Sequence, residues 1–164
     1  MKIVFTGGGS GGHFYPIIAV IEKCVDLIER EKIVDARLYF LAPSPYDRQA
    51  LFENGVKFET VPAGKMRRGF SVLAPIEFIK TALGFLKAIF SLWVIYPDVV
   101  FGKGGYGSFP TLLAAKILRI PIVIHESDSV PGRTNVWAGD FSDRIAISYA
   151  EAAEYFPKDK TAYT

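Results

Sequence analysis

The fold is decided by the stretch Lys2-Ile3-Val4-Phe5-Thr6-Gly7-Gly8-Gly9-Ser10-Gly11-Gly12-His13. Its first five residues form a short apolar run that is typical of a buried strand. The glycines permit a tight turn into a helix, which we expect over 14–30 because Pro16 is tolerated in a first turn. A buried strand, a glycine turn and a helix in this order indicate a parallel α/β sheet.

The rest of the chain repeats this alternation of short apolar runs and helical patterns. Further strands are expected over 37–42, 57–62, 98–101, 121–125 and 144–148. Helices are expected over 46–54, 72–96, 109–118, 133–141 and 150–155. The predicted fold class is therefore α/β, a Rossmann-like three-layer domain with helices on both faces of a parallel sheet. The domain is expected over 1–156, and the polar tail 157–164, without a partner element, is interpreted as the start of a linker to a second, absent domain.

Composition narrows the class of protein. A chain of 164 residues, half of them hydrophobic, fits one domain with a real core. The net charge of +2 is too small to argue for nucleic-acid binding. The single cysteine, Cys24, lies in an apolar helical pattern and is interpreted as a packed thiol. The N-terminus lacks a signal-peptide layout, so export is not expected.

The first glycine loop predicts an anion site. Backbone N–H groups at a helix start, with the positive end of the helix dipole, suit a phosphate. The loop also satisfies the dinucleotide pattern G-x-G-x-x-G, which requires an acidic residue at the end of the second strand. That strand ends in Phe40-Leu41-Ala42-Pro43, so a nicotinamide-dependent oxidoreductase is disfavoured. A plain strand-to-helix turn would explain two glycines but not five with a serine and a histidine.

Two more polar segments follow predicted strands. The fourth strand leads into Gly102-Lys103-Gly104-Gly105-Tyr106-Gly107-Ser108, and the fifth into His125-Glu126-Ser127-Asp128. Because parallel strands end at one edge of a sheet, we expect these segments to line one pocket with the first loop. Glu126 is a candidate acceptor for sugar hydroxyls or a candidate proton carrier. The alternatives are that Ser108 only caps a helix and that Asp128 only organises a turn.

Together the motifs resemble the N-terminal domain of glycosyltransferase family 28. The resemblance covers essentially the whole chain and rests on the first glycine loop with His13, on Gly104-Gly105-Tyr106, and on His125-Glu126 with Pro131-Gly132 and Thr134-Asn135. It implies one half of a GT-B enzyme and an inverting, metal-independent transfer of N-acetylglucosamine (GlcNAc) from UDP-GlcNAc. The implied acceptor is the 4-hydroxyl of N-acetylmuramic acid (MurNAc) in lipid I, undecaprenyl-diphospho-MurNAc-pentapeptide, and the product is lipid II of peptidoglycan. No cofactor and no metal is implied.

The resemblance also assigns roles to residues. His13 is the first candidate for proton handling or diphosphate contact, and Glu126 is the second. Substrate contacts are expected from Gly8, Gly9, Ser10, Gly11, Gly12, Gly104, Gly105, Tyr106, His125, Asp128 and Asn135. The family usually reads His-Glu-Gln-Asn where this chain has Ser127 and Asp128, which removes an amide donor and adds a negative charge at the acceptor site.

Residues 70–96 form a dense apolar segment that Glu77, Lys80 and Lys87 interrupt, so we do not expect it to span a bilayer. Read as a helix it carries a polar stripe and two apolar stripes. The polar stripe is Glu77, Lys80, Gly84, Lys87 and Ser91. One apolar stripe is Ile76, Ile79, Leu83, Leu86, Phe90 and Trp93, and the other is Phe78, Ala82, Phe85, Ile89, Leu92 and Tyr96.

A soluble protein needs only one apolar stripe on such a helix, so the second is expected to contact an anionic membrane surface. The predicted membrane contacts are Phe78, Phe85, Ile89 and Leu92 with the cations Lys80, Lys87, Arg67 and Arg68. A helix enclosed in the core or in a dimer contact is the alternative. The resemblance places the protein peripherally at the cytoplasmic face of the inner membrane.

The resemblance places most contacts to the donor UDP-GlcNAc in a C-terminal domain that this chain lacks, so we expect the chain alone to be inactive. The alternative hypothesis is an acceptor-binding or membrane-recruiting subunit of a two-chain glycosyltransferase.

Overall fold

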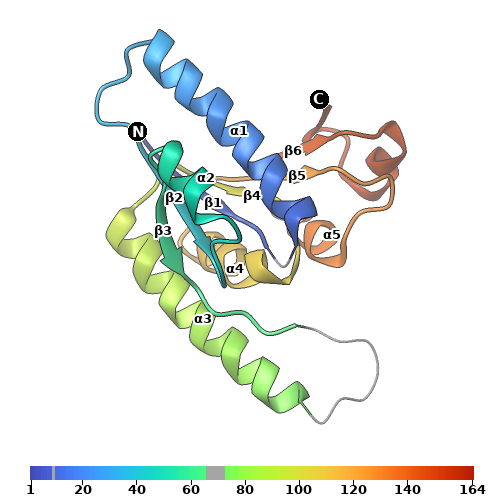
Figure 1. Ribbon diagram of the computed structural model, residues 1–164. Coiled ribbons are helices and arrows are strands. Elements are labelled where there is room, and N and C mark those ends of the chain that lie inside the picture. The colour runs from blue at the N-terminus through green and yellow to red at the C-terminus, as the bar shows by residue number, and fades with distance from the viewer. Residues whose placement is uncertain (9, 66–72) are drawn as a thin grey trace.

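The computed structural model of the chain describes residues 1–8, 10–65 and 73–164. Within them, seven parallel strands form one sheet in the order β3-β2-β1-β4-β5-β6-β7 (Figure 1). The strands are β1 (Lys2–Thr6), β2 (Arg37–Ala42), β3 (Lys57–Thr60), β4 (Val99–Gly102), β5 (Ile122–Glu126), β6 (Arg144–Ile147) and β7 (Thr161–Tyr163). The helices are α1 (Gly11–Arg30), α2 (Arg48–Glu53), α3 (Ala74–Ile95), α4 (Phe109–Ile117) and α5 (Arg133–Gly139), with the 3₁₀ turns η1 (Tyr106–Ser108) and η2 (Ala150–Tyr155).

The α/β architecture predicted from the sequence is confirmed, with one error at the C-terminal end. The tail 157–164 was expected to have no partner element, but it contributes β7, which pairs in parallel with β6 through Ile145 and Thr161. The backbone of Thr164 also donates to Ile147. The polar composition of the tail hid this strand because β7 is short and lies at the edge of the sheet, where its side chains are largely exposed.

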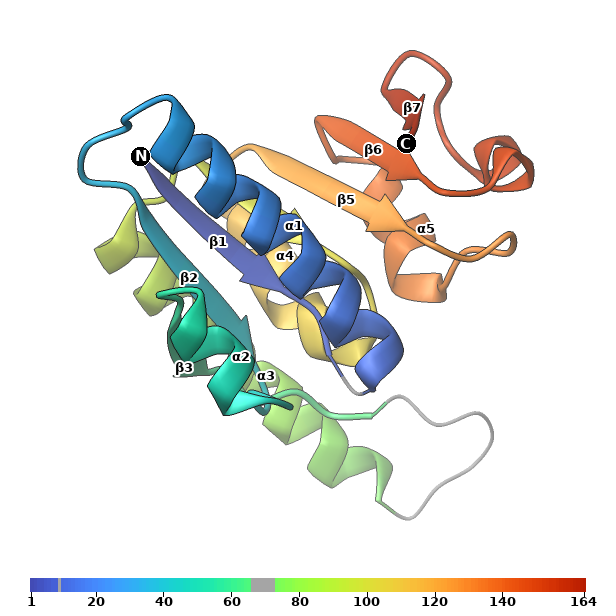
Figure 2. The same cartoon turned by 45° about the horizontal axis from the view of Figure 1, so that its top comes forward.

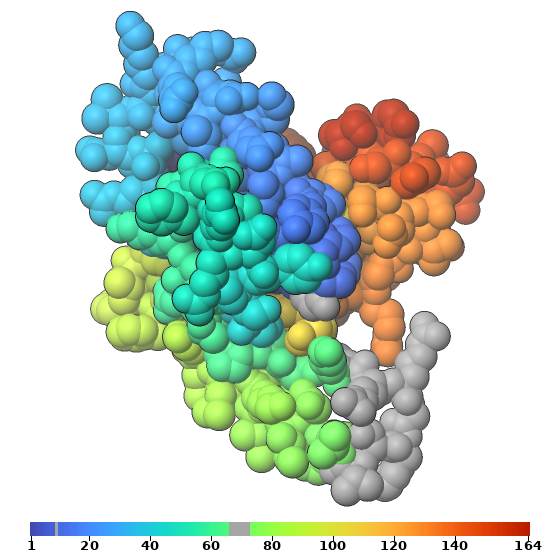
Figure 3. All heavy atoms as spheres, viewed as in Figure 1, coloured from blue at the N-terminus to red at the C-terminus, as the bar shows by residue number. Residues whose placement is uncertain are grey.

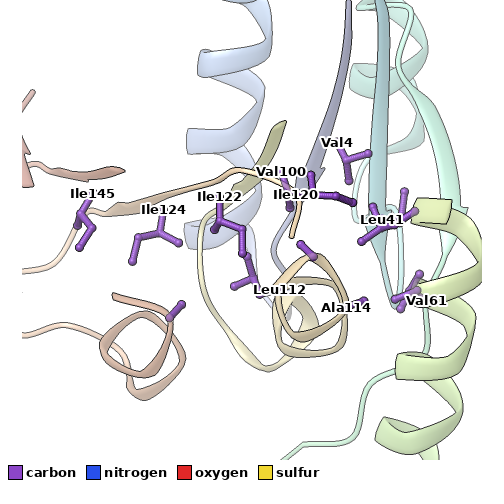
Figure 4. Close-up of a cluster of buried hydrophobic side chains, with 14 of the residues drawn as sticks. Val4, Leu41, Val61, Val100, Leu112, Ala114, Ile120, Ile122, Ile124 and Ile145 are labelled. Carbon is purple, nitrogen blue, oxygen red and sulfur yellow. The ribbon is translucent and has the colours of Figure 1, made fainter. Parts of the chain in front are cut away.

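Two layers of helices cover the sheet, one on each face, as Figure 2 shows. On one face α1 and α2 bury Phe14, Ile17 and Leu51 against the strands. On the other face α3, α4 and α5 pack against a second cluster. Figure 4 shows this cluster, in which side chains of the strands lie against α4. Its labelled residues are Val4, Leu41, Val61, Val100, Leu112, Ala114, Ile120, Ile122, Ile124 and Ile145.

Helix α3 approaches the body of the protein through small residues. A Cβ added at Gly84 would lie 1.7 Å from the backbone oxygen of Pro62, so the two backbones are in direct contact there. Ala88 is fully buried, and Ser91 donates a hydrogen bond to Glu59. Leu92 is fully buried in the core cluster. Small residues spaced three or four apart therefore mark the inward side of α3.

Candidate functional site

The first glycine loop joins β1 to α1 at the carboxyl edge of the sheet. Gly8 has a φ of +147°, a conformation that other residues rarely adopt. Ser10 takes the N-cap position of α1, and its backbone oxygen accepts from the amides of His13 and Phe14. The first turn of α1 contains no acidic residue. The start of α1 therefore presents its positive dipole end without a carboxylate to neutralise it.

The second glycine loop, between β4 and η1, lies directly against the first. Gly105 has a φ of +78°, and a Cβ added there would lie 2.4 Å from the backbone oxygen of Gly8 and 3.3 Å from Nε2 of His13. Gly104 has a φ of +83°. Ser108 does not cap α4 with its side chain; its hydroxyl donates to the oxygen of Gly105 and closes the loop. Two loops from strands β1 and β4 thus meet around His13.

The third segment, after β5, is organised by Glu126, which is 3% exposed. One carboxylate oxygen accepts from the amides of Ser127 and Asp128, at 2.8 and 3.0 Å. The other accepts from the amide of Gly132 and from Nδ2 of Asn135, both at 3.0 Å. Four N–H donors occupy the carboxylate, so the structure uses Glu126 to hold the loop 127–132 rather than as a free acceptor.

Asn135 extends this network to the second glycine loop. Its Nδ2 also donates to the backbone oxygen of His125. A Cβ added at Gly104 would lie 2.8 Å from Oδ1 of Asn135, so the side chain packs against the glycine backbone. Asn135 is 2% exposed and therefore connects the loops from beneath instead of facing an open pocket.

Lys103 lies under the meeting point of the three loops. It is 1% exposed, and its Nζ donates to Oγ of Ser127 at 2.8 Å. Burial lowers the pKa of Lys103, while the nearby carboxylates of Glu126 and Asp128 oppose that change. Asp128 itself is exposed. Both carboxylates therefore favour the charged form of the buried Lys103.

The two histidines share this electrostatic environment. Burial lowers the pKa of His13 below its ordinary value of 6.5, and the positive charge of Lys103 lowers it further. Burial and then Lys103 also lower the pKa of His125, whose Nε2 lies 3.1 Å from Oγ of Ser148. Among the described residues, Nδ1 of each histidine is buried without a hydrogen-bond partner. Both changes in pKa favour the neutral form of the rings at pH 7.

The structure brings together most of the residues predicted for the site. Gly8, His13 and Gly105 are in contact, and Asn135 joins Gly104 to Glu126. Ser10 and Gly12 are exposed beside them, while Gly11 is half-buried against Tyr46. Gly9 lies outside the described residues. In the part of the chain that the structure describes, no group of three His, Cys, Asp or Glu side chains could hold a metal ion.

Two features of the site were missed in the sequence. The sequence places Lys103 in a glycine loop and gives no sign of its burial, which the structure shows. A cavity of about 420 Å³ lies beside Tyr106, between α3, α4 and α5. It is lined by Gly64, Thr81, Tyr106, Phe109, Arg133, Thr134 and Trp137. These residues come from α3, η1, α4, α5 and the segment after β3, which lie far apart in the sequence, so no single sequence pattern connects them.

The predicted membrane contacts on α3 need a correction. Leu92 is fully buried, and Phe85 and Ile89 are half-buried against the core, so these side chains face the sheet. Phe78 is 75% exposed, and Lys80 and Lys87 are exposed, while Arg67 and Arg68 lie outside the described residues. The stripe that is exposed along its whole length is instead the other one, here called the α3 outer face. It consists of Ile76, Ile79, Leu83, Leu86, Phe90 and Trp93, all between 51% and 68% exposed.

Figure 3 shows α3 along one edge of the molecule, in yellow-green. Among the described residues, α3 is the one helix long and apolar enough to cross a membrane, with a mean hydropathy of 1.7 over its most apolar window. It packs closely on α4 and on the segment that follows β3. Its buried side is thus committed to the fold, and its outer face forms an exposed apolar surface with Lys80 and Lys87 beside it.

Comparison with known proteins gives a consistent result. Residues 3–147 match the family model described as the glycosyltransferase family 28 N-terminal domain. A protein of Treponema denticola, named UDP-N-acetylglucosamine–N-acetylmuramyl-(pentapeptide) pyrophosphoryl-undecaprenol N-acetylglucosamine transferase, is 38% identical over 94% of this chain and 40% of its own length. A protein of the same name from Halalkalibacterium halodurans is 39% identical over 100% of this chain and 44% of its own length. The chain thus spans less than half the length of these relatives.

Among solved structures, the crystal structure of MurG from Acinetobacter baumannii superposes with a TM-score of 0.79 at 24% identity, over 99% of this chain and 45% of that one. At this identity the likeness supports the fold alone.

Proposed function

The chain belongs to glycosyltransferase family 28, as an N-terminal domain, and from this membership we propose that it binds the lipid-linked acceptor of an inverting N-acetylglucosaminyltransferase. The acceptor is lipid I, undecaprenyl-diphospho-MurNAc-pentapeptide, and the donor is UDP-GlcNAc. Both appear in the names of the relatives in Treponema denticola and Halalkalibacterium halodurans. The donor binds mainly to a second domain, so this chain contributes acceptor recognition and proton handling.

The observation that carries the proposal is the contact between Gly8 and Gly105 at the start of α1. Two loops whose positive φ values favour glycine bring backbone close to the positive end of a helix. The same place has a buried cation, Lys103, and no acidic residue in the first turn of α1. A diphosphate carries the negative charge and the many acceptor oxygens that such a site satisfies.

His13 is the proposed base of the reaction. Its ring lies beside Gly105, and because burial and Lys103 lower its pKa, it is neutral and ready to accept a proton at pH 7. The 4-hydroxyl oxygen of MurNAc attacks the anomeric carbon of GlcNAc, and its proton passes to His13. The bond from that carbon to the UDP oxygen breaks with inversion, and UDP leaves with the electron pair.

Glu126 is proposed as a positioning residue, which revises its expected role as a second proton carrier. Its carboxylate already accepts four hydrogen bonds. It fixes the loop that carries Ser127 and Asp128, and through Asn135 it fixes the second glycine loop. The exposed carboxylate of Asp128 faces the acceptor, with Lys103 offsetting its charge.

The α3 outer face is proposed to rest on the cytoplasmic surface of the membrane that holds the acceptor. Six large apolar side chains bury surface in the headgroup region, while Lys80 and Lys87 attract anionic lipids. Phe78 lies on a flank of this face and remains a proposed contact. The closeness of α3 to the body of the protein keeps the helix in the membrane plane rather than across it.

The test is binding of a synthetic lipid I with a short prenyl chain, measured by calorimetry. The chain is expected to bind it, to bind UDP-GlcNAc weakly, and to transfer no GlcNAc alone. His13→Ala should leave acceptor binding within about threefold of wild type, yet prevent turnover when the variant is joined to the donor half of a relative. Turnover near wild type in that hybrid would exclude His13 as the base.

A further inference from the structure

The cavity between α3, α4 and α5 lies next to the proposed diphosphate site but on the other side of Tyr106. Tyr106 follows Gly105 in the chain, and Gly105 contacts both Gly8 and His13. Tyr106 also lines the cavity. The proposed diphosphate site and the cavity are therefore joined by the neighbouring residues Gly105 and Tyr106.

The walls of the cavity are apolar. The rings of Phe109 and Trp137 pack against each other with their centroids 4.7 Å apart. The hydroxyl of Thr81 accepts from the amide of Gly64 and donates to the oxygen of Glu77. Its hydrogen-bonding capacity is thus used within the protein, so Thr81 offers the cavity little more than its methyl group. Such walls suit an unsaturated hydrocarbon and give a sugar or a peptide few hydrogen bonds.

Two cations lie in or beside this cavity. Lys65 places its Nζ 5.6 Å from the centre of the Tyr106 ring. Arg133, exposed at the first position of α5, lines the cavity. None of the described residues that line it is acidic. The cavity therefore combines apolar walls with positive charge at Lys65 and Arg133.

The cavity also lies close to the proposed membrane surface. Thr81 stands between Ile79 and Leu83 in the sequence, and these two belong to the α3 outer face. The same turns of α3 thus carry the cavity wall on one side and the outer face on the other, about 10 Å apart across a helix. A lipid that lies against the outer face is therefore one helix width from the cavity.

We propose that this cavity binds the phosphate-proximal isoprene units of a polyprenyl diphosphate, with Arg133 and Lys65 contacting the phosphates. The inference rests on the proposed function, because it assigns the lipid part of the same acceptor. It adds a binding site for the isoprene unit that is attached to the diphosphate. The protein would therefore bind an allylic diphosphate more tightly than a diphosphate without a lipid.

The test uses farnesyl diphosphate, inorganic diphosphate and UDP as probes of the full chain. The sequence has two tryptophans, Trp93 on the α3 outer face and Trp137 in the cavity. All measurements are made in a Trp93→Phe background, so that fluorescence reports on the cavity alone. Farnesyl diphosphate is expected to change the emission of Trp137 and to bind about tenfold more tightly than inorganic diphosphate, because it buries apolar surface.

Thr134→Phe fills the cavity, and Val136→Phe is its matched control on the same helix, 39% exposed and outside the cavity. Thr134→Phe should abolish the roughly tenfold advantage of the farnesyl group and leave the affinity for inorganic diphosphate unchanged. Arg133→Gln, at an exposed position that tolerates the change, should lower the affinity for farnesyl diphosphate about fivefold. Its matched control is Arg37→Gln at the exposed start of β2, which lies at the amino ends of the strands and away from the glycine loops at their carboxyl ends.

The outcomes separate the two proposals. If farnesyl diphosphate binds no more tightly than inorganic diphosphate, or if Thr134→Phe leaves its affinity unchanged, the cavity assignment is wrong while the glycine-loop site stands. If UDP changes the emission of Trp137 as strongly, the cavity is a nucleotide site and the assignment is again wrong. If neither diphosphate binds, the proposed function itself fails.

Discussion

The glycine-loop edge and helix α3 differ in how their sequence relates to their structure. At the edge, Gly8 and Gly105 have positive φ values that other residues rarely adopt, and Gly105 also has no room for a Cβ. The glycines in the sequence therefore indicate the geometry of the loops. On α3 two apolar stripes look equivalent in the sequence, and only the packing decides which one is buried. Backbone-determined sites can therefore be located from a motif, whereas the exposed side of an apolar helix depends on what it packs against.

The largest expected effect concerns the close contact of α3. Gly84→Ala places a Cβ about where the backbone oxygen of Pro62 lies, and neither backbone can move freely. We expect a loss of about 3 kcal/mol or more in the free energy of unfolding, measured by urea denaturation. In a helix without this contact, Gly→Ala raises the free energy of unfolding by about 1 kcal/mol, so the sign of the change shows whether the contact exists.

Ala82→Gly, at an exposed position of the same helix, serves as the control and should cost about 1 kcal/mol. A stable Gly84→Ala protein would mean that α3 does not pack as closely as described.

This contact explains why the sequence could not assign the faces of α3 correctly. The expected polar stripe contains Gly84 and Ser91, but the structure buries both. Their small size, and not their polarity, decides their place on the helix. Small residues at a spacing of three or four were a usable signal for the inward side. The strand order and the meeting of three loops, by contrast, followed from the parallel α/β pattern, because the carboxyl ends of such strands share one edge.

The second prediction concerns the network beneath the loops. Glu126→Gln replaces a carboxylate that accepts four hydrogen bonds by an amide whose NH₂ must face two of the donors. We expect a loss of about 2 to 3 kcal/mol in unfolding free energy. Glu154→Gln, on the exposed surface, should change it by less than about 0.5 kcal/mol.

The sequence could suggest a site at Glu126 but not this role, because the donors come from residues up to nine positions away, in a loop whose conformation it does not specify. If Glu126→Gln is as stable as wild type, the four hydrogen bonds do not hold the loop, and Glu126 is available as an acceptor for substrate.

The third prediction separates the two sides of α3 by membrane binding. Leu86→Glu with Phe90→Glu, both on the α3 outer face, should reduce partitioning onto anionic vesicles by about tenfold or more, measured by sedimentation. The matched control, Val34→Glu with Phe52→Glu, alters two side chains that are at least 82% exposed elsewhere and should have little effect.

Leu92→Glu should instead unfold the protein, because Leu92 is buried in the core. If the outer-face pair binds vesicles as wild type does, the interfacial role of α3 is excluded.

The smallest expected effect is electrostatic. The sequence has two histidines, so nuclear magnetic resonance can follow both. The pKa values of both histidines should lie below 6.5, and Lys103→Met should raise both. The increase should be smaller than the decrease caused by burial, because burial is the larger cause of the lowered pKa values. Lys23→Met on the exposed surface of α1 should move neither.

The lowered histidine pKa values also make the stability of the protein depend on pH. Because the folded protein favours neutral histidines, this contribution is fully present above pH 6.5 and is lost as the pH falls through the lowered pKa values. Histidine pKa values unchanged by Lys103→Met would remove Lys103 from the electrostatics of the site.

The most direct measurement is the affinity for inorganic diphosphate, by calorimetry, of wild type, Gly105→Ala and Gly132→Ala. A Cβ at Gly105 meets the backbone of Gly8, whereas a Cβ at Gly132 meets no described atom within 4 Å. We predict that Gly105→Ala, confirmed as folded by its circular dichroism, loses about tenfold or more in affinity and that Gly132→Ala keeps it. Equal affinity in all three proteins would contradict a diphosphate site between the two glycine loops.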